Sequence, residues 1–130
     1  MDENITKEYY AIIKTKISQG SVKAGLEQKD KLLYNFPSDP VGYYFKGVCF
    51  FALESYDVSV KYYINALKLD PAFVKAYYNL GVSYYMLEKK DLALINIAKA
   101  LVLSTRFKKQ EERVRCVNTL RFIGARDDAI

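Results

Sequence analysis

The sequence contains no histidine, only two cysteines and no long apolar segment. Without histidine there is no imidazole to shuttle protons near neutral pH or to ligate a metal. Cys49 and Cys116 form no Cys-x-x-Cys pair, which excludes zinc ribbons, disulfide frameworks and dithiol redox centres. The longest apolar run, residues 48–53, is far shorter than the roughly 20 residues that a membrane-spanning helix needs.

The remaining composition is that of a globular protein. The 130 residues are 51% hydrophobic and 27% charged, which is typical of one folded domain. The chain begins with the acidic segment Met1-Asp2-Glu3-Asn4, which does not resemble a secretory signal. We therefore expect a cytoplasmic protein that has no contact with a membrane.

The net charge of +5 is unevenly distributed along the chain. Residues 1–65 contain eight lysines and eight acidic residues, so the whole excess lies in residues 66–130. It is densest from Arg106 to Arg121, where six basic residues accompany two acidic ones. Such a cluster attracts nucleic acid or an acidic surface, although a solvated helix face is the more common explanation.

A period of 34 residues organises the sequence. Identical residues recur at this distance in both halves of the unit, which predicts an array of structural repeats. The pairs include Gly47 and Gly81, Tyr43 and Tyr77, Asp57 and Asp91, Ala66 and Ala100, Tyr9 and Tyr43, and Pro37 and Pro71.

Each unit is predicted to hold two helices. In the second unit, Asp39 and Pro40 are the preferred residues for an N-cap and a first helical position. A polar break at residues 54–55 separates this helix from a second one over residues 56–69. Pro71 then disfavours helical geometry at the residue before it and separates this pair of helices from the next.

These residues resemble the tetratricopeptide repeat family, whose pattern alternates large aromatic and small residues and ends with proline. The third unit matches it well, apart from Thr105 at the position of the proline. The first unit departs from it, with Ile13 for a small residue and Lys16 for an aromatic one. The matching residues are Tyr77, Leu80, Gly81, Tyr84, Ala93 and Ala100 in the third unit, and Tyr43, Gly47, Phe50, Ser59, Tyr63, Ala66 and Pro71 in the second.

The resemblance implies an all-α fold, a right-handed solenoid that forms a single domain over residues 1–130. Its three helix-turn-helix repeats are expected at about residues 6–39, 40–73 and 74–107. A capping helix is expected over residues 108–123, where an apolar stripe faces the core and Gly124 acts as a stop, followed by a frayed tail over residues 124–130. The stripe consists of Val114, Val117, Leu120 and Ile123.

The resemblance also implies a concave groove lined by the first helix of each repeat. Its middle is aromatic and apolar and its ends are basic, which suits an extended or helical peptide with apolar anchors and some acidic character. The alternative is that the aromatic residues only shield neighbouring helices, although exposed apolar groups at Phe45 and Val48 favour a covered groove. The groove residues are Tyr10, Lys14, Tyr44, Phe45, Val48, Phe51, Lys75, Tyr78, Asn79, Val82, Tyr85, Met86, Lys109 and Arg113.

Some relatives, the cochaperones of the large heat-shock chaperones, bind a C-terminal carboxylate with five side chains on three successive first helices. Asn79, Lys109 and Arg113 match the last three of those positions. Tyr44 and Val48 occupy the first two and do not match, and each missing charged hydrogen bond weakens binding. We therefore expect no complete carboxylate clamp.

We expect a non-catalytic adaptor, cochaperone or chaperone-like module with no cofactor and no metal. The sequence has no pairing of nucleophile and base and no glycine-rich phosphate loop. Small secretion chaperones of pathogenic bacteria are built from three such repeats and are similar in size. One alternative is a self-associating scaffold, a homo-oligomer in which one copy's groove holds a segment of another. A third is binding of nucleic acid or an acidic surface through residues 106–121.

Overall fold

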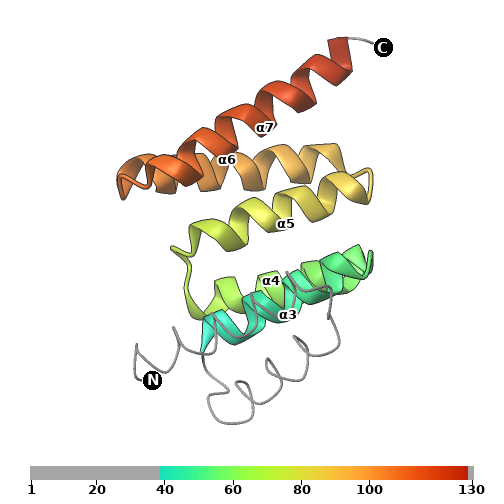
Figure 1. Cartoon of the computed structure of the whole chain (residues 1–130), viewed down its shortest axis with the longest axis vertical. Coiled ribbons are helices and arrows are strands. Elements are labelled where there is room, and N and C mark those ends of the chain that lie inside the picture. Colours follow the sequence, from blue (N-terminus) through green and yellow to red (C-terminus); the bar gives the residue numbers. More distant parts are fainter. Residues whose placement is uncertain (1–38, 129–130) are drawn as a thin grey trace. The chain divides into compact units, whose positions relative to one another are not determined.

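The computed structural model describes residues 39–128, and these residues form five α-helices and no β-strand (Figure 1). The chain divides after Pro71 into two compact units, α3 and α4 in the first and α5 to α7 in the second. The predicted first repeat, with Tyr10 and Lys14, lies outside the described residues. The helices are α3 (Pro40–Ala52), α4 (Tyr56–Leu69), α5 (Val74–Met86), α6 (Lys90–Arg106) and α7 (Gln110–Asp128).

The helices of the first unit begin and end where the sequence predicts. A carboxylate oxygen of Asp39 accepts a hydrogen bond from the backbone N–H of Val41 at 2.8 Å, and Pro40 is the first residue of α3. Helix α4 spans residues 56–69. Asp70 then has an extended backbone, with φ −138° and ψ 92°, as expected of a residue that precedes proline.

Three of the turns share one backbone conformation in which a residue other than glycine has positive φ. The residues are Glu54, Glu88 and Lys108, with φ of 61°, 61° and 54°. In the turn after α5, the N–H of Lys89 donates to the carbonyl of Tyr84 at 2.9 Å, and that of Glu88 to Tyr85 at 3.0 Å. This is the Schellman motif, which usually places glycine in the left-handed position because a Cβ there costs about 1 kcal/mol.

Replacing Glu88 by glycine should raise the free energy of unfolding by about 0.5–1 kcal/mol, because glycine avoids the Cβ penalty at positive φ. Urea denaturation followed by circular dichroism measures this change. Glu88→Ala is the control, since it removes the carboxylate but keeps the Cβ. A glycine variant less stable than the alanine variant would contradict the prediction.

Gly47 and Gly81 allow the two helices of each pair to approach closely. A Cβ at Gly47 would lie 2.5 Å from the ring of Tyr63, which is 1% exposed. A Cβ at Gly81 would lie 2.5 Å from a side-chain carbon of Ile97 and 2.9 Å from the carbonyl oxygen of Ala93. Tyr63 and Ile97 are themselves 34 residues apart, so the same contact between glycine and a large side chain repeats in both units.

Helix α7 packs mainly against α6, which it crosses at an angle (Figure 1). The core of this unit is small and apolar. Half-buried side chains surround it, among them Tyr77, Tyr78, Leu101 and Leu120. The buried members of the core are Val74, Ile97, Ala100, Cys116 and Ile123.

The structure corrects the expected bounds and packing of the last helix. Helix α7 begins at Gln110 and continues through Gly124 to Asp128, so residues 124–128 are helical and are not a frayed tail. Gly124 does not end the helix, because an interior glycine costs only about 1 kcal/mol and nothing requires positive φ there. Val114 is 44% exposed and lies outside the core, where Cys116 faces inward instead.

Replacing Gly81 by alanine should lower the free energy of unfolding by about 1–3 kcal/mol, because the new methyl group overlaps Ile97 and the backbone of Ala93. Gly124→Ala is a matched control within another helix. Nothing lies within 4 Å of a Cβ at Gly124, so alanine there should stabilise the protein by up to about 1 kcal/mol. Thermal and urea unfolding compare the two variants, and equal effects would contradict the packing argument.

Candidate functional site

Helices α5 and α7 lie side by side in parallel, with facing residues 37 positions apart. The repeat period is 34, so α7 is displaced by three residues from the position that the period predicts. The displacement equals the difference in length between the second helices of the two pairs, since α6 has 17 residues and α4 has 14. The facing pairs are Lys75 with Glu112, Tyr78 with Arg115, and Tyr85 with Phe122.

The side chains on this surface change from charged at one end to apolar at the other. Residues spaced three or four apart lie on one side of a helix, so the side chains of this surface form one row along α5 and a second row along α7. We call this surface the α5–α7 face. It consists of Lys75, Tyr78, Asn79, Val82, Tyr85 and Met86 on α5, and Glu112, Arg115, Thr119 and Phe122 on α7.

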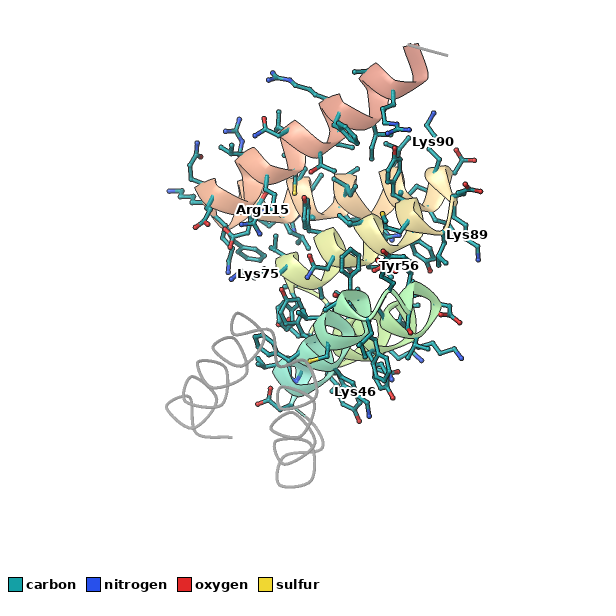
Figure 2. The ribbon with its side chains drawn as sticks, turned by 45° about the vertical axis from the view of Figure 1, so that its right-hand side comes forward. Lys46, Tyr56, Lys75, Lys89, Lys90 and Arg115 are labelled. Atoms are coloured by element: carbon teal, nitrogen blue, oxygen red, sulfur yellow. The ribbon has the colours of Figure 1, made fainter. Side chains whose placement is uncertain are left out.

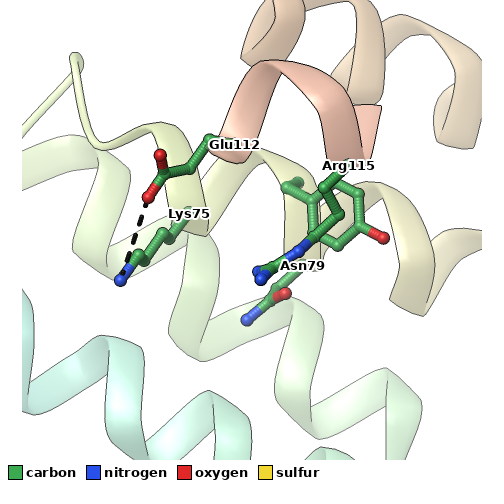
Figure 3. A pocket seen from close by; sticks show the side chains of 5 residues that line it. Lys75, Asn79, Glu112 and Arg115 are labelled. Atoms are coloured by element: carbon green, nitrogen blue, oxygen red, sulfur yellow. Dashed lines mark ion pairs between the residues drawn. The ribbon is translucent and has the colours of Figure 1, made fainter. Parts of the chain in front are cut away.

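The charged end encloses a shallow hollow (Figure 3). The ammonium of Lys75 lies 4.0 Å from a carboxylate oxygen of Glu112, and Asn79 and Arg115 complete the lining with Tyr78. A water molecule has only about 10 Å³ of accessible space there, which is room for about one. The hollow is therefore a place for one side-chain group of a ligand and too small for a whole small molecule.

Tyr78 joins the two helices in the middle of the face. Its hydroxyl lies 2.8 Å from the hydroxyl of Thr119, a hydrogen bond in which either group can donate. The guanidinium of Arg115 lies 5.8 Å from the centre of the Tyr78 ring, in cation–π geometry (Figure 3). The same guanidinium is 3.6 Å from a carboxylate oxygen of Glu111, one turn earlier in α7. These contacts hold the phenol and the guanidinium in fixed positions.

The apolar end leaves large side chains open to solvent. The rings of Tyr85 and Phe122 meet edge to face with 6.4 Å between their centres. Phe122 is nevertheless 53% exposed, and Met86, which follows Tyr85 in α5, is 46% exposed. The guanidinium of Arg126 lies 5.8 Å from the Phe122 ring and borders this end with positive charge. Neighbouring exposed apolar side chains of this kind mark a surface that a partner can cover.

The structure places six of the predicted groove residues together on this face and leaves two out. Lys75, Tyr78, Asn79, Val82, Tyr85 and Met86 all lie along α5. Lys109 and Arg113 are exposed and are not part of the face. Residues two apart on a helix point to nearly opposite sides, so Arg113 points away from the face to which Arg115 contributes.

Sequence reasoning missed Arg115 because it extended the 34-residue period into α7. The signal was Thr105, which replaces the proline that follows α4 at Pro71. Without proline to stop it, α6 continues to Arg106 and shifts the register of α7. In the shifted register, Glu112 lies opposite Lys75 and buried Cys116 takes the place expected for Arg113, so the partial match to a carboxylate clamp is lost.

In the first unit, two predicted groove residues belong to the core. Tyr44 is 8% exposed and Phe45 is 4% exposed, so the expectation that Phe45 presents an open apolar surface is wrong. The Tyr44 ring meets the ring of Phe45 at 5.1 Å and that of Tyr63 at 5.9 Å. Val48 and Phe51 are half-buried.

Neither cysteine is placed for nucleophilic chemistry. Cys49 and Cys116 are both free thiols and both are fully buried. Burial raises the pKa of the Cys116 thiol above its ordinary value, an effect that the nearby Arg115 partly opposes. Within residues 39–128, no three histidine, cysteine, aspartate or glutamate side chains are grouped as a metal site would require. Across the same part of the chain, no helix has both the length and the apolar character needed to cross a membrane.

Solved structures with the same architecture are numerous, although no curated protein matches the sequence. The translocator chaperone SycD of the Yersinia enterocolitica type III secretion system superposes with a TM-score of 0.83 and 14% identity, over 98% of this chain and 89% of that one. PcrH, solved with the chaperone-binding region of PopD, gives 0.83 and 16%, over 98% and 96%. The first repeat domain of Spaghetti (RPAP3), bound to the HSP90 peptide SRMEEVD, gives 0.73 and 20%, over 93% and 97%.

The fold is therefore that of an α-helical repeat protein, a solenoid of helix-turn-helix units. Residues 47–87 match the sequence model of the TPR repeat family, which covers the end of α3, all of α4 and all of α5. Residues 47–87 therefore carry tetratricopeptide repeat sequence, and the chain has the fold of proteins built from such repeats.

The hydrogen bond between Tyr78 and Thr119 should contribute about 1 kcal/mol to stability. A double-mutant cycle with Tyr78→Phe, Thr119→Val and the double variant isolates this contribution, measured by urea denaturation. Each single variant should be destabilised, and the double variant should be less destabilised than the sum. Additive effects would show that the two hydroxyl groups do not interact in solution.

Proposed function

We propose that this protein is a non-catalytic, chaperone-like adaptor of the cytoplasm that holds an internal segment of a partner protein against the α5–α7 face. The observation that carries the proposal is the pairing of an exposed apolar end, Met86 and Phe122, with a charged hollow around Arg115. A face of this kind offers an apolar anchor site and a polar contact to one extended or helical segment.

A role in binding fits the face better than a role in catalysis. The hollow has room for about one water molecule, and the nearest thiol, Cys116, is buried with a raised pKa. Neither feature provides an activated nucleophile or a cavity for a substrate. Fixed aromatic rings beside open apolar side chains instead provide contact area at a low cost in conformational entropy.

The structural neighbours support a peptide ligand but differ in what they bind. PcrH holds a region of PopD, whereas the RPAP3 domain holds the HSP90 peptide SRMEEVD. In this chain, Glu112 already pairs with Lys75, and a neutral, buried Cys116 lies where a clamp would place arginine. A free C-terminal carboxylate would compete with Glu112 for Lys75 and with Glu111 for Arg115. We therefore infer that the ligand is an internal segment of a partner protein.

The chemistry of the face also limits the composition of the segment. Met86 and Phe122 suit one large apolar side chain, and Arg115 suits one acidic side chain. Glu111 and Glu112 partly neutralise the cations of the hollow, so a strongly acidic peptide gains little. Contacts of this extent are expected to give a dissociation constant near the micromolar range, about −8 kcal/mol.

Selection of peptides from a phage-displayed random library on the immobilised protein tests the proposal. Enriched peptides, synthesised and labelled, should bind with affinities near micromolar by fluorescence anisotropy, and Met86→Asp combined with Phe122→Asp should weaken them at least about tenfold. Val114→Asp is the control, because Val114 lies on the same helix as Phe122 at a similar exposure but outside the face. It should leave the dissociation constant unchanged.

The form of the peptide terminus distinguishes the two modes of binding. Amidating the C-terminus of an enriched peptide should change its affinity by less than about twofold, because the face lacks a carboxylate clamp. A requirement for the free carboxylate would contradict the assignment of an internal segment. Binding that survives the Met86 and Phe122 substitutions in a folded variant would place the peptide site elsewhere.

A further inference from the structure

The outward side of α6 carries an apolar stripe that the α5–α7 face does not use. Leu92, Ile95 and Val102 are 42%, 50% and 58% exposed. Their spacings of three and seven residues place them on one side of the helix. The opposite side of α6 packs into the core through Ile97 and Ala100. The stripe is therefore a second surface, separate from the proposed peptide site.

Opposite charges border the two ends of the stripe. Asp91 lies in the first turn of α6 and Arg106 in its last turn, and both side chains are exposed. Fifteen residues separate them, about 22 Å along the helix, so they cannot pair with each other in one copy. Each side chain also lies at the end of the helix where the helix dipole stabilises a charge of its sign.

This arrangement is complementary to itself when two copies of α6 meet antiparallel. A two-fold axis between residues 98 and 99 places Asp91 of one copy opposite Arg106 of the other, and Ile95 opposite Val102. Both contacts occur twice because the interface is isologous. We propose that a second copy of this chain docks on the outward side of α6 in this orientation.

The residues at the centre of the stripe suit a close approach of two helices. Ala98 is small and exposed, so it keeps the helix axes near each other. Lys99 is the one charged residue at the centre, and its ammonium lies 5.9 Å from the centre of the Tyr77 ring on α5 of its own unit. Directed toward its own unit, this ammonium need not face its symmetry mate across the axis.

The extent of the stripe predicts a weak dimer. A helix of 17 residues is about 25 Å long and offers less than the about 800 Å² per partner of a stable complex. The dimer should therefore form and dissociate with protein concentration. It also leaves the α5–α7 face free, so its failure and the failure of the peptide proposal are separate results.

Sedimentation velocity over roughly a hundredfold range of concentration tests the proposal. The full chain should show a reversible monomer–dimer equilibrium, and Ile95→Glu combined with Val102→Glu should weaken dimerisation at least about tenfold. Val114→Glu places one glutamate on α7, on an apolar residue of similar exposure, and should leave the equilibrium unchanged. A monomer at every concentration, or equal effects of the two changes, overturns the proposal.

Exchange of the terminal charges then tests the orientation. Asp91→Arg and Arg106→Asp should each weaken dimerisation about tenfold, because each creates two repulsive pairs across the axis. The double exchange should restore the dissociation constant to within about threefold of the original, since opposite charges face each other again. Because the two residues are too far apart to interact in one copy, recovery supports the antiparallel dimer. If the effects add instead, the proposed orientation is wrong.

Discussion

The close approach of paired helices, made possible by Gly47 and Gly81, is the contact on which the rest of the structure depends. At both positions a side chain would overlap a large buried residue, Tyr63 or Ile97. The absence of a Cβ lets that residue fill the space between the helices at the density of a protein interior. Because Ile97 also belongs to the core that holds Cys116 and Ile123, the same contact determines how α7 attaches.

The length of α6 decides which side chains of α7 reach α5. The three residues that α6 has beyond α4 move α7 along its axis, so Glu112, Arg115 and Phe122 face α5. The ion pair between Lys75 and Glu112 contributes little to holding this register, because the lysine side chain is 41% exposed and the atoms are 4.0 Å apart. Burial of Cys116 and Ile123 against α5 and α6 is the stronger contribution.

The second unit presents two surfaces of different chemistry, and Lys75 and Arg115 lie at the same end of the first of them (Figure 2). Along the α5–α7 face, aromatic rings are fixed by neighbours while Met86 and Phe122 remain open, and charges gather at one end. On α6 the exposed residues are aliphatic and the charges lie at the two ends of the helix. The first arrangement suits a segment with one apolar anchor and one polar contact, and the second suits a copy of itself. A protein with both could bind its partner as a monomer or as a weak dimer.

Much of the fold follows from local patterns that are visible along the chain. The 34-residue period, the cap formed by Asp39 and Pro40, and the limits of residues 56–69 depend on neighbours within a turn or two, and the structure agrees with each. The positions that α5 contributes to the face also follow from that spacing. The burial of Tyr44 and Phe45 and the register of α7 do not, because they depend on side chains of other helices and on the length of α6. A repeat pattern specifies which side of a helix is apolar, whereas packing between helices decides how far that side is covered and which residues it meets.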